Sequence, residues 1–136
     1  MSKRQPYYVG IKGIIKNSEG DVLILRDSST GKWEAPGGRM DADQTIEEAF
    51  SREIGEEVEG AVLQSLGNVF YVAQGGFTVE DEHKLLLLFY ETIVDMPLKI
   101  KLSFEHTDFA WVNAKSLADY DIYASDKAAV MKVFNS

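Results

Sequence analysis

Runs of apolar, strand-forming residues dominate the pattern of this chain. Tyr7–Lys16 and Val22–Arg26 flank the turn Asn17-Ser18-Glu19-Gly20, which predicts a β-hairpin. A bend is expected at Gly75-Gly76, and an exposed acidic turn at Glu80-Asp81-Glu82-His83. The other predicted strands are Ala61–Ala73, Lys84–Val94, Ile100–Leu102 and Phe109–Val112. The last predicted element is an amphipathic helix over Ser125–Phe134, with Ser125 as its N-cap.

A second helix is predicted over residues 46–58. At 100° per residue, one face carries the apolar residues Ile46, Ala49, Phe50, Ile54 and Val58. Glu57 falls in the middle of this stripe, Glu53 lies on its edge, and Glu56 lies just outside it. Thr45 and Glu48 are spaced as a capping box at the helix start. On the exposed face, Glu48 and Arg52 are spaced to pair.

The charges of this helix need a counter-charge. Asp41–Gly60 holds eight acidic residues and one base, Arg52, so this stretch has a net charge of −7 within a chain of −8. Burying an unpaired carboxylate costs several kcal/mol, and a hard divalent metal with oxygen ligands is an economical partner. Acidic helices usually present a solvated face instead. That explanation accounts for Glu48 and Glu59, but not for Glu53 and Glu57.

The same segment resembles the signature of the Nudix hydrolases, G-x5-E-x7-R-E-U-x-E-E-x-G-U, where U is a bulky aliphatic residue. Six of its nine specified positions match, at Gly38, Arg52, Glu53, Ile54, Glu56 and Glu57. Trp33, Pro36 and Gly37 are similar to the W-x-x-P-G-G sequence that precedes the signature in many members. The motifs cover about 28 residues, from Trp33 to Gly60, and the order of flanking strands fits the family. The resemblance implies an α/β/α sandwich around a mixed, curled β-sheet.

Three positions depart from the signature. Gln44 replaces its first glutamate, and Glu59 and Gly60 occupy its final glycine and aliphatic positions. An amide keeps a hydrogen bond but adds no charge. Gly60 can still end the helix in a left-handed conformation, and a helix one residue longer is expected, with Ala61 or Val62 in the aliphatic role.

The resemblance also implies the chemistry. Members of the family use Mg²⁺ or Mn²⁺ to direct water at one phosphorus of a diphosphate bridge. Its implied metal ligands here are the Gly38 backbone, Glu53, Glu56 and Glu57, with Arg52 orienting Glu53. Glu105 is the candidate general base outside the signature. The neighbouring His106 is a second candidate, although a histidine in a loop is more often solvated. The expected catalytic residues are therefore Arg52, Glu53, Glu56, Glu57 and Glu105, and the expected substrate-binding residues are Trp33 and Arg39. A base can also stack on Phe70, Tyr71 or Phe77, although such aromatics usually belong to the core.

Composition fits a small enzyme of a single domain over residues 1–136, with 45% hydrophobic residues. The chain has no cysteine, which excludes disulfides, a thiol nucleophile and a zinc–thiolate site. The N-terminal segment lacks the apolar stretch of a signal peptide, and the longest apolar run, Leu85–Tyr90, is too short to span a bilayer. We therefore expect a cytoplasmic protein without a membrane partner. The acidic charge argues against a nucleic-acid polymer as partner, and a homodimer is compatible with the sequence.

Three functions remain open at this stage. The first is a metal-dependent hydrolase that cleaves the diphosphate linkage of a nucleoside diphosphate derivative, with a nucleoside triphosphate or related nucleotide favoured. The second is a catalytically weak or inactive nucleotide-binding or sensor module of the same fold, which Gln44 and Glu59 would support. The third is a metal-binding α/β domain unrelated to phosphate chemistry.

Overall fold

The computed structural model describes residues 3–58, 60–95 and 100–136. A four-stranded mixed sheet, in the order β4-β1-β6-β5, lies beside a three-stranded sheet, in the order β3-β2-β7. The strands are β1 (Tyr7–Ile15), β2 (Val22–Asp27), β3 (Trp33–Glu34), β4 (Gly37–Arg39), β5 (Val62–Glu80), β6 (His83–Asp95) and β7 (His106–Val112). The helices are α1 (Ile46–Glu57), the short 3-10 helix η1 (Ser116–Asp119) and α2 (Ala124–Phe134). Among these strands, only β1 and β6 pair in parallel.

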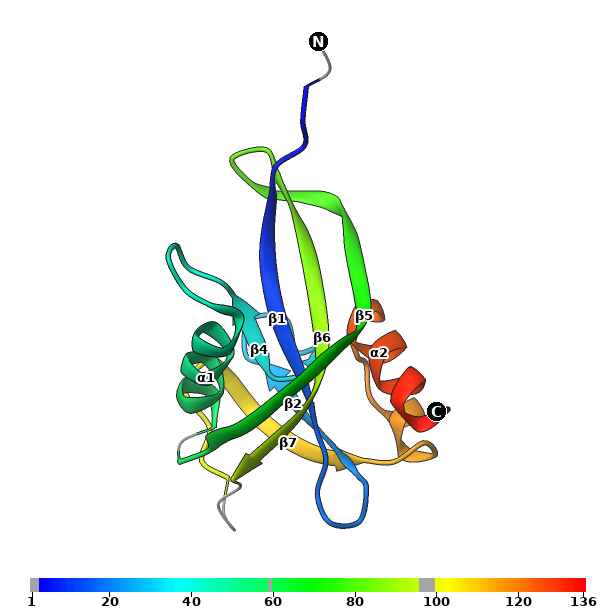
Figure 1. The fold of residues 1–136 in the computed structure, drawn as a ribbon. Coiled ribbons are helices and arrows are strands. Elements are labelled where there is room, and N and C mark those ends of the chain that lie inside the picture. The colour runs from blue at the N-terminus through cyan, green and yellow to red at the C-terminus, as the bar shows by residue number, and fades with distance from the viewer. Residues whose placement is uncertain (1–2, 59, 96–99) are drawn as a thin grey trace.

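The helices α1 and α2 lie on opposite sides of the strands (Figure 1). Successive side chains of a strand point to opposite faces. Most consecutive side chains of β1 and β2 are buried, so both faces of these strands are covered. Ile14 and Ile24 pack in the core beneath α2, whereas Ile11 and Leu25 pack in the core beneath α1. This two-sided burial explains the nearly continuous apolar runs of both strands. The predicted α/β/α sandwich around a mixed sheet is confirmed.

Helix α1 follows its predicted pattern closely. Thr45 accepts a hydrogen bond from the backbone of Glu48, and the Glu48 carboxylate accepts one from the backbone of Thr45, which completes the capping box. Glu48 is therefore used at the helix start, and the ion pairs of Arg52 go to other carboxylates. The helix ends at Glu57, with Val58 already extended, so the longer helix was a wrong expectation. Gly60 has the predicted positive φ, 88°, while Glu59 lies outside the described residues.

Further differences concern the ends of elements. β5 continues as a strand through Gly75-Gly76, but its register with β6 shifts between Gln74 and Thr78, where these glycines lie. The chain reverses at Asp81 and Glu82, which both have positive φ. The residue before α2 is Tyr123 and it gives no side-chain cap, so the Ser125 N-cap was wrong. Ile100–Leu102 is not a strand but forms an isolated bridge between Leu102 and Val58.

Candidate active site

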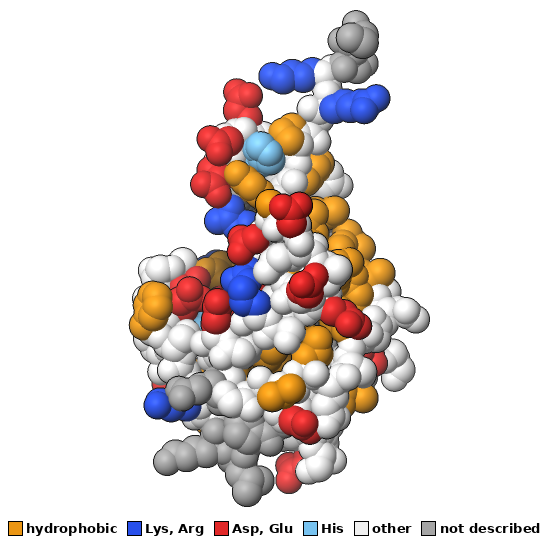
Figure 2. Space-filling view, turned by 60° about the vertical axis from the view of Figure 1, so that its left-hand side comes forward, with side chains coloured by type: hydrophobic (Ala, Val, Ile, Leu, Met, Phe, Trp, Pro, Cys, Tyr) orange, Lys and Arg blue, Asp and Glu red, His pale blue; other side chains and the backbone are white. Residues whose placement is uncertain are grey.

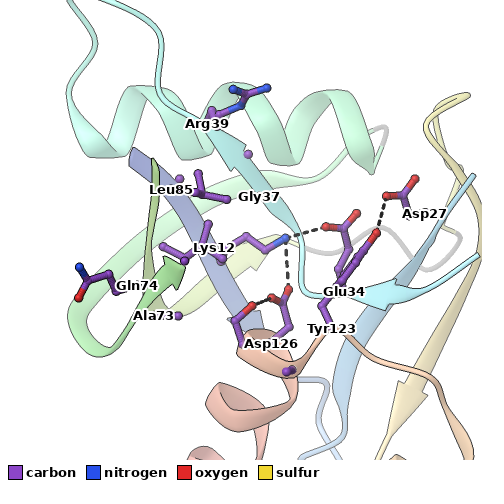
Figure 3. Close-up of a pocket in the computed structure, with 16 residues that line it drawn as sticks. Lys12, Asp27, Glu34, Gly37, Arg39, Ala73, Gln74, Leu85, Tyr123 and Asp126 are labelled. Atoms are coloured by element: carbon purple, nitrogen blue, oxygen red, sulfur yellow. Dashed lines mark hydrogen bonds and ion pairs between the residues drawn. The ribbon is translucent and has the colours of Figure 1, made fainter. Parts of the chain in front are cut away.

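Two adjoining cavities open between the two sheets and α1. One, the acidic cavity, has a volume of about 510 Å³ and is lined by Arg52, Glu53, Glu57, Glu105 and His106 among others. The other, the central cavity of Figure 3, has about 490 Å³ and extends over β1, β5 and β6 toward α2. They share the lining residues Asp27, Glu34, Gly37, Gly38 and Arg39. A ligand can therefore span both cavities across the short strand β4.

The two glycines of β4 allow helix α1 and strand β1 to approach the loop. A Cβ on Gly37 would lie 2.1 Å from the carbonyl oxygen of Ile11, and Gly37 has a φ of 141° that other residues rarely adopt. A Cβ on Gly38 would lie 2.5 Å from the Glu53 carboxylate. The absence of side chains at these two positions lets the Glu53 carboxylate lie directly against the loop.

Glu57 is the buried carboxylate of the site, with only 2% of its surface exposed. Its Oε1 accepts a 2.7 Å hydrogen bond from the backbone N–H of Gly37, and its Oε2 lies 3.6 Å from Nε2 of His106. Burial raises the pKa of Glu57 well above its usual range. The Lys12 ammonium and the Gly37 N–H act against this rise, while the Glu34 and Glu53 carboxylates add to it. The core-facing position expected from the sequence is confirmed.

Arg52 gathers the outer carboxylates of the site. Its guanidinium lies 3.0 Å from Glu53, 3.2 Å from Asp41 and 3.5 Å from Glu56. Burial raises the pKa of Glu53, Arg52 lowers it, and the Glu56 and Glu105 carboxylates raise it further. Arg52 thus orients Glu53 and holds together carboxylates that would otherwise repel one another.

The donor set suits a hard divalent cation, because it offers carboxylate oxygens beside a loop without side chains. Glu53 places its carboxylate against Gly38, and Glu57 places a buried carboxylate beside Gly37. Among residues 3–58, 60–95 and 100–136, however, no three carboxylate or imidazole groups are already arranged around one metal position. The ion pairs to Arg52 explain this, since they hold Glu53 and Glu56. Each of these ion pairs uses one oxygen of its carboxylate, Oε1 of Glu53 and Oε2 of Glu56.

A buried ion cluster centred on Lys12 joins the two cavities. The Lys12 ammonium lies 2.9 Å from Glu34 and 3.3 Å from Asp126, as Figure 3 shows. Burial alone would lower the pKa of Lys12, but Asp126, Glu34 and Glu57 together hold it above its usual value. Asp126 also accepts a 2.9 Å hydrogen bond from the backbone of Ala35, just ahead of the loop.

Lys12, Glu34 and Asp126 were not predicted from the sequence, because the counter-charge was sought only inside Asp41–Gly60. The sequence does contain a signal, since Lys12 interrupts the apolar run of β1, and a lysine inside a buried strand needs a partner. The partners come from distant segments, so their identity could not be inferred. Lys12 supplies part of the positive charge that was expected from metal alone.

His106 is buried, contrary to the solvated loop position expected for it, because β7 begins at this residue. Its Nε2 lies 3.1 Å from Glu34, whereas its Nδ1 has no hydrogen-bond partner among the described residues. Glu105, the residue before it, is exposed and lines the acidic cavity. The first residue of β7 and the residue before it therefore both lie at the acidic cavity.

The two expected substrate-binding residues lie in different places. Arg39 lines both cavities, pairs with Glu80 at 2.6 Å and lies over the ring of Tyr8. Trp33 packs edge-to-face on Tyr120 against the α2 core and is absent from the lining of both cavities. The other aromatics considered, Phe70 and Tyr71, pack against the same core. The side chain of Phe77 lies outside the described part of the structure.

The acidic turn between β5 and β6 is exposed, as expected. Figure 2 shows acidic side chains gathered around a histidine on this hairpin tip. Asp81 and Glu82 are exposed, and His83 stacks on Tyr8 with 4.4 Å between the ring centroids. His83 thus packs this turn against β1. No helix within the described segments is long and apolar enough to cross a membrane.

Comparison with known proteins gives one consistent result. The family model of the NUDIX domain matches residues 6–133. The nucleoside triphosphatase NudI of Escherichia fergusonii is 31% identical over 99 residues, covering 68% of this chain and 69% of that protein. A MutT-like protein of Streptomyces ambofaciens is 37% identical over 49 residues, covering 36% of this chain and 32% of its own. The chain spans about a third of the length of two of the curated relatives that it matches.

The fold is likewise shared with solved structures. The MutT protein of Methanosarcina mazei Go1 superimposes with a TM-score of 0.81 and 25% identity, covering 98% of this chain and 97% of that one. The match of the family model to nearly the whole chain agrees with the loop, the capped helix and the R-E-x-x-E-E residues described above. The chain belongs to the Nudix hydrolase family.

Proposed function

We propose that this protein is a metal-dependent pyrophosphohydrolase that cleaves the diphosphate linkage of a nucleoside diphosphate derivative, with nucleoside triphosphates as the favoured substrate class. The observation that carries the proposal is the position of Glu53 and Glu57, which meet the glycine loop at the wall of a cavity of about 510 Å³. The name of the Escherichia fergusonii relative, a nucleoside triphosphatase, supports the substrate class.

Glu53, Glu56, Glu57 and the Gly38 backbone would hold Mg²⁺ or Mn²⁺. When bound, the metal neutralises phosphate charge and lowers the pKa of the attacking water. The protein's own groups prepare this step. Gly37 fixes the Glu57 carboxylate through its N–H, and Arg52 orients Glu53 from the side. Glu105 lies at the same cavity and is assigned as the general base that accepts the proton of the water.

The central cavity is suited to the nucleoside end of such a substrate. Its walls combine the apolar side chains of Leu85 and Leu87 with Tyr123 and Gln74. Arg39 lines both cavities, and its guanidinium would have to leave Glu80 to bind phosphate oxygens at their junction. This placement would put the base over β1 and β6 and the diphosphate against β4. Trp33, by contrast, packs against the core and lines neither cavity.

The test is a panel of nucleoside triphosphates and nucleoside diphosphate derivatives incubated with saturating Mg²⁺ or Mn²⁺. Released phosphate and pyrophosphate are measured, and the nucleotide products are separated to show which linkage breaks. Hydrolysis of at least one triphosphate, abolished by chelation, is expected. The exposed Glu47 on the same helix gives a matched control, since Glu47→Gln should retain the activity that Glu53→Gln loses. Absence of turnover across the panel, with tight nucleotide binding, would instead support the sensor module.

A further inference from the structure

Five side chains form a buried chain of polar contacts that runs from α2 to α1. It passes in order through Asp126, Lys12, Glu34, His106 and Glu57. Each of these residues is buried except Glu34, whose side chain is 20% exposed where it faces the cavities. The Nudix signature contains only the last of them. The other four come from α2, β1, β3 and β7, so this series of contacts connects the signature helix to the rest of the fold.

Lys12 is the most firmly held residue in this series of contacts. Its side chain is only 7% exposed, and its ammonium is engaged by two carboxylates at 2.9 and 3.3 Å. An ammonium so enclosed has little freedom to reach a substrate phosphate. Its partner Asp126 is held in turn by the backbone of Ala35 and by the hydroxyl of Ser125. Lys12 is thus anchored to the protein on the side away from the acidic cavity.

The two oxygens of Glu34 divide between neighbours on either side. Oε1 accepts from Lys12 and Oε2 lies 3.1 Å from Nε2 of His106. The same imidazole nitrogen lies 3.6 Å from Oε2 of Glu57. A shift of Glu34 would therefore release His106, whose Nδ1 has no partner in the described chain to hold the ring. On the side of Glu57 away from its bond to Gly37, Oε2 faces this imidazole.

We propose that Lys12 is a positioning residue for the metal-binding carboxylates: it fixes Glu34, and through it His106, which sets the orientation of Glu57. The inference rests on the proposed function for its consequence in catalysis, but its geometry is independent of any substrate. Replacing a residue that orients a metal ligand from the side away from the metal typically changes metal affinity by about 10–100-fold.

The decisive measurement is the sign of the change in Mn²⁺ affinity in Lys12→Met. If Lys12 acted only through its charge, its removal would make the cavity more negative and tighten Mn²⁺ binding. Loss of positioning weakens binding, and we expect the dissociation constant to rise by roughly tenfold. Free Mn²⁺ is counted by electron paramagnetic resonance, with Lys127→Met as the control, because Lys127 is an exposed lysine of α2. Unchanged or tighter Mn²⁺ binding by Lys12→Met overturns the proposal.

A second readout needs no metal. The chain has two histidines, so imidazole nitrogen and proton signals in nuclear magnetic resonance spectra are readily assigned. In metal-free Lys12→Met the His106 signals should shift, whereas those of His83, stacked on Tyr8 in the hairpin, should stay in place. Identical His106 signals in wild type and variant would contradict the proposed connection through Glu34.

Lys12→Met leaves buried carboxylates without their partner and can fail to fold. The double variant Lys12→Met/Asp126→Asn removes one charge of each sign and keeps the net charge of the cluster. Weaker Mn²⁺ binding is still expected, and wild-type binding would overturn the proposal. If wild type binds Mn²⁺ without hydrolysing any nucleotide and the folded Lys12 variants bind Mn²⁺ more weakly, the proposed function fails while this inference stands. If wild type hydrolyses nucleotides and the folded variants bind Mn²⁺ as wild type does, the proposed function stands and this inference fails.

Discussion

The backbone N–H of Gly37 donates a 2.7 Å hydrogen bond to the buried carboxylate of Glu57, and this bond joins the glycine loop to the end of helix α1. A charged acceptor makes such a bond stronger than one between neutral groups. It fixes one oxygen of Glu57 and leaves the other toward His106. The same bond holds the loop at the position where Gly38 meets Glu53.

The pH dependence of stability follows from the buried carboxylate. Burial raises the pKa of Glu57 in the folded state, so the folded protein binds its proton more tightly than the unfolded chain does. Its contribution is fully present below the unfolded pKa, about 4.3, and is lost as the pH rises through the folded pKa. Metal-free Glu57→Gln should therefore be more stable than wild type at pH 7, and this advantage should vanish near pH 4. Urea unfolding at both pH values measures it, and an equal difference at both would contradict the assignment.

Divalent metal should stabilise wild type more than Glu57→Gln. A ligand that binds only the native state stabilises it by mass action, and about 2.7 kcal/mol is gained at 100 times the dissociation constant. Millimolar Mn²⁺ or Mg²⁺ should raise the Tm of wild type more than that of Glu57→Gln. Calorimetry with and without the metal gives both shifts, and samples treated with a chelator provide the metal-free baseline. Equal shifts for the two proteins would remove Glu57 from the metal site.

Catalysis should respond more steeply than stability. If the metal supplies several kcal/mol at the transition state, Glu53→Gln or Glu57→Gln should lower kcat by roughly 10²–10⁴, at about 1.4 kcal/mol per decade. The exposed Glu47→Gln should remain close to wild type. Circular dichroism establishes that each variant is folded before its turnover is compared. A folded Glu57→Gln protein with wild-type kcat would exclude a role for this carboxylate in the reaction.

Gln44 is used structurally at the position where the signature has glutamate. Its side-chain oxygen accepts a 2.8 Å hydrogen bond from the backbone of Asp41, and a carboxylate can accept the same bond. In Gln44→Glu, a favourable interaction of about 0.3–1 kcal/mol with the helix N-terminus opposes the added negative charge. Metal-free stability should change little, and activity with Mg²⁺ should hold or rise. An inactive wild type with an active Gln44→Glu would identify a decayed hydrolase.

The capping box provides a test of the fold that is independent of metal. Thr45→Ala removes the acceptor for the Glu48 backbone N–H at the start of α1. The expected loss is about 1 kcal/mol of unfolding free energy, within the range of 0.5–2 kcal/mol for such caps. Denaturant titration measures it, and Ser18→Ala gives a comparison in an exposed turn. A loss below the experimental error would show that tertiary contacts alone fix this end of the helix.

Local periodicity predicted the parts of the molecule that depend on neighbouring residues. The spacing of apolar residues placed Glu57 on the buried face of α1, and the Thr45–Glu48 spacing gave the correct start of that helix. The signature likewise predicted that Gly38 and Glu53 belong to one site, and the two residues lie against each other. These features are decided within one turn or one loop, where sequence separation is small.

Contacts between distant segments account for what sequence reasoning did not find. Lys12 and Asp126 meet across the fold, and no local pattern links them. Gly75 and Gly76 were expected to separate two strands, but β5 continues through a register shift at these glycines and pairs with β6 up to Glu80. His106 was expected in a loop, but β7 starts at that residue and buries it. In each case tertiary pairing outweighs the local preference of the residue.

The hydrogen bond from Ala35 to Asp126 also sets when this site can form during synthesis. The two residues are 91 positions apart, so the loop ahead of Gly37 lacks its buried acceptor until α2 has been made. At ribosomal rates of about 5–20 residues per second, that interval lasts roughly 5–20 seconds. The signature helix is complete early, but it waits for the C-terminal helix before its glycine loop is fully anchored. A nascent chain released before α2 would carry every residue of the signature and still lack the assembled site.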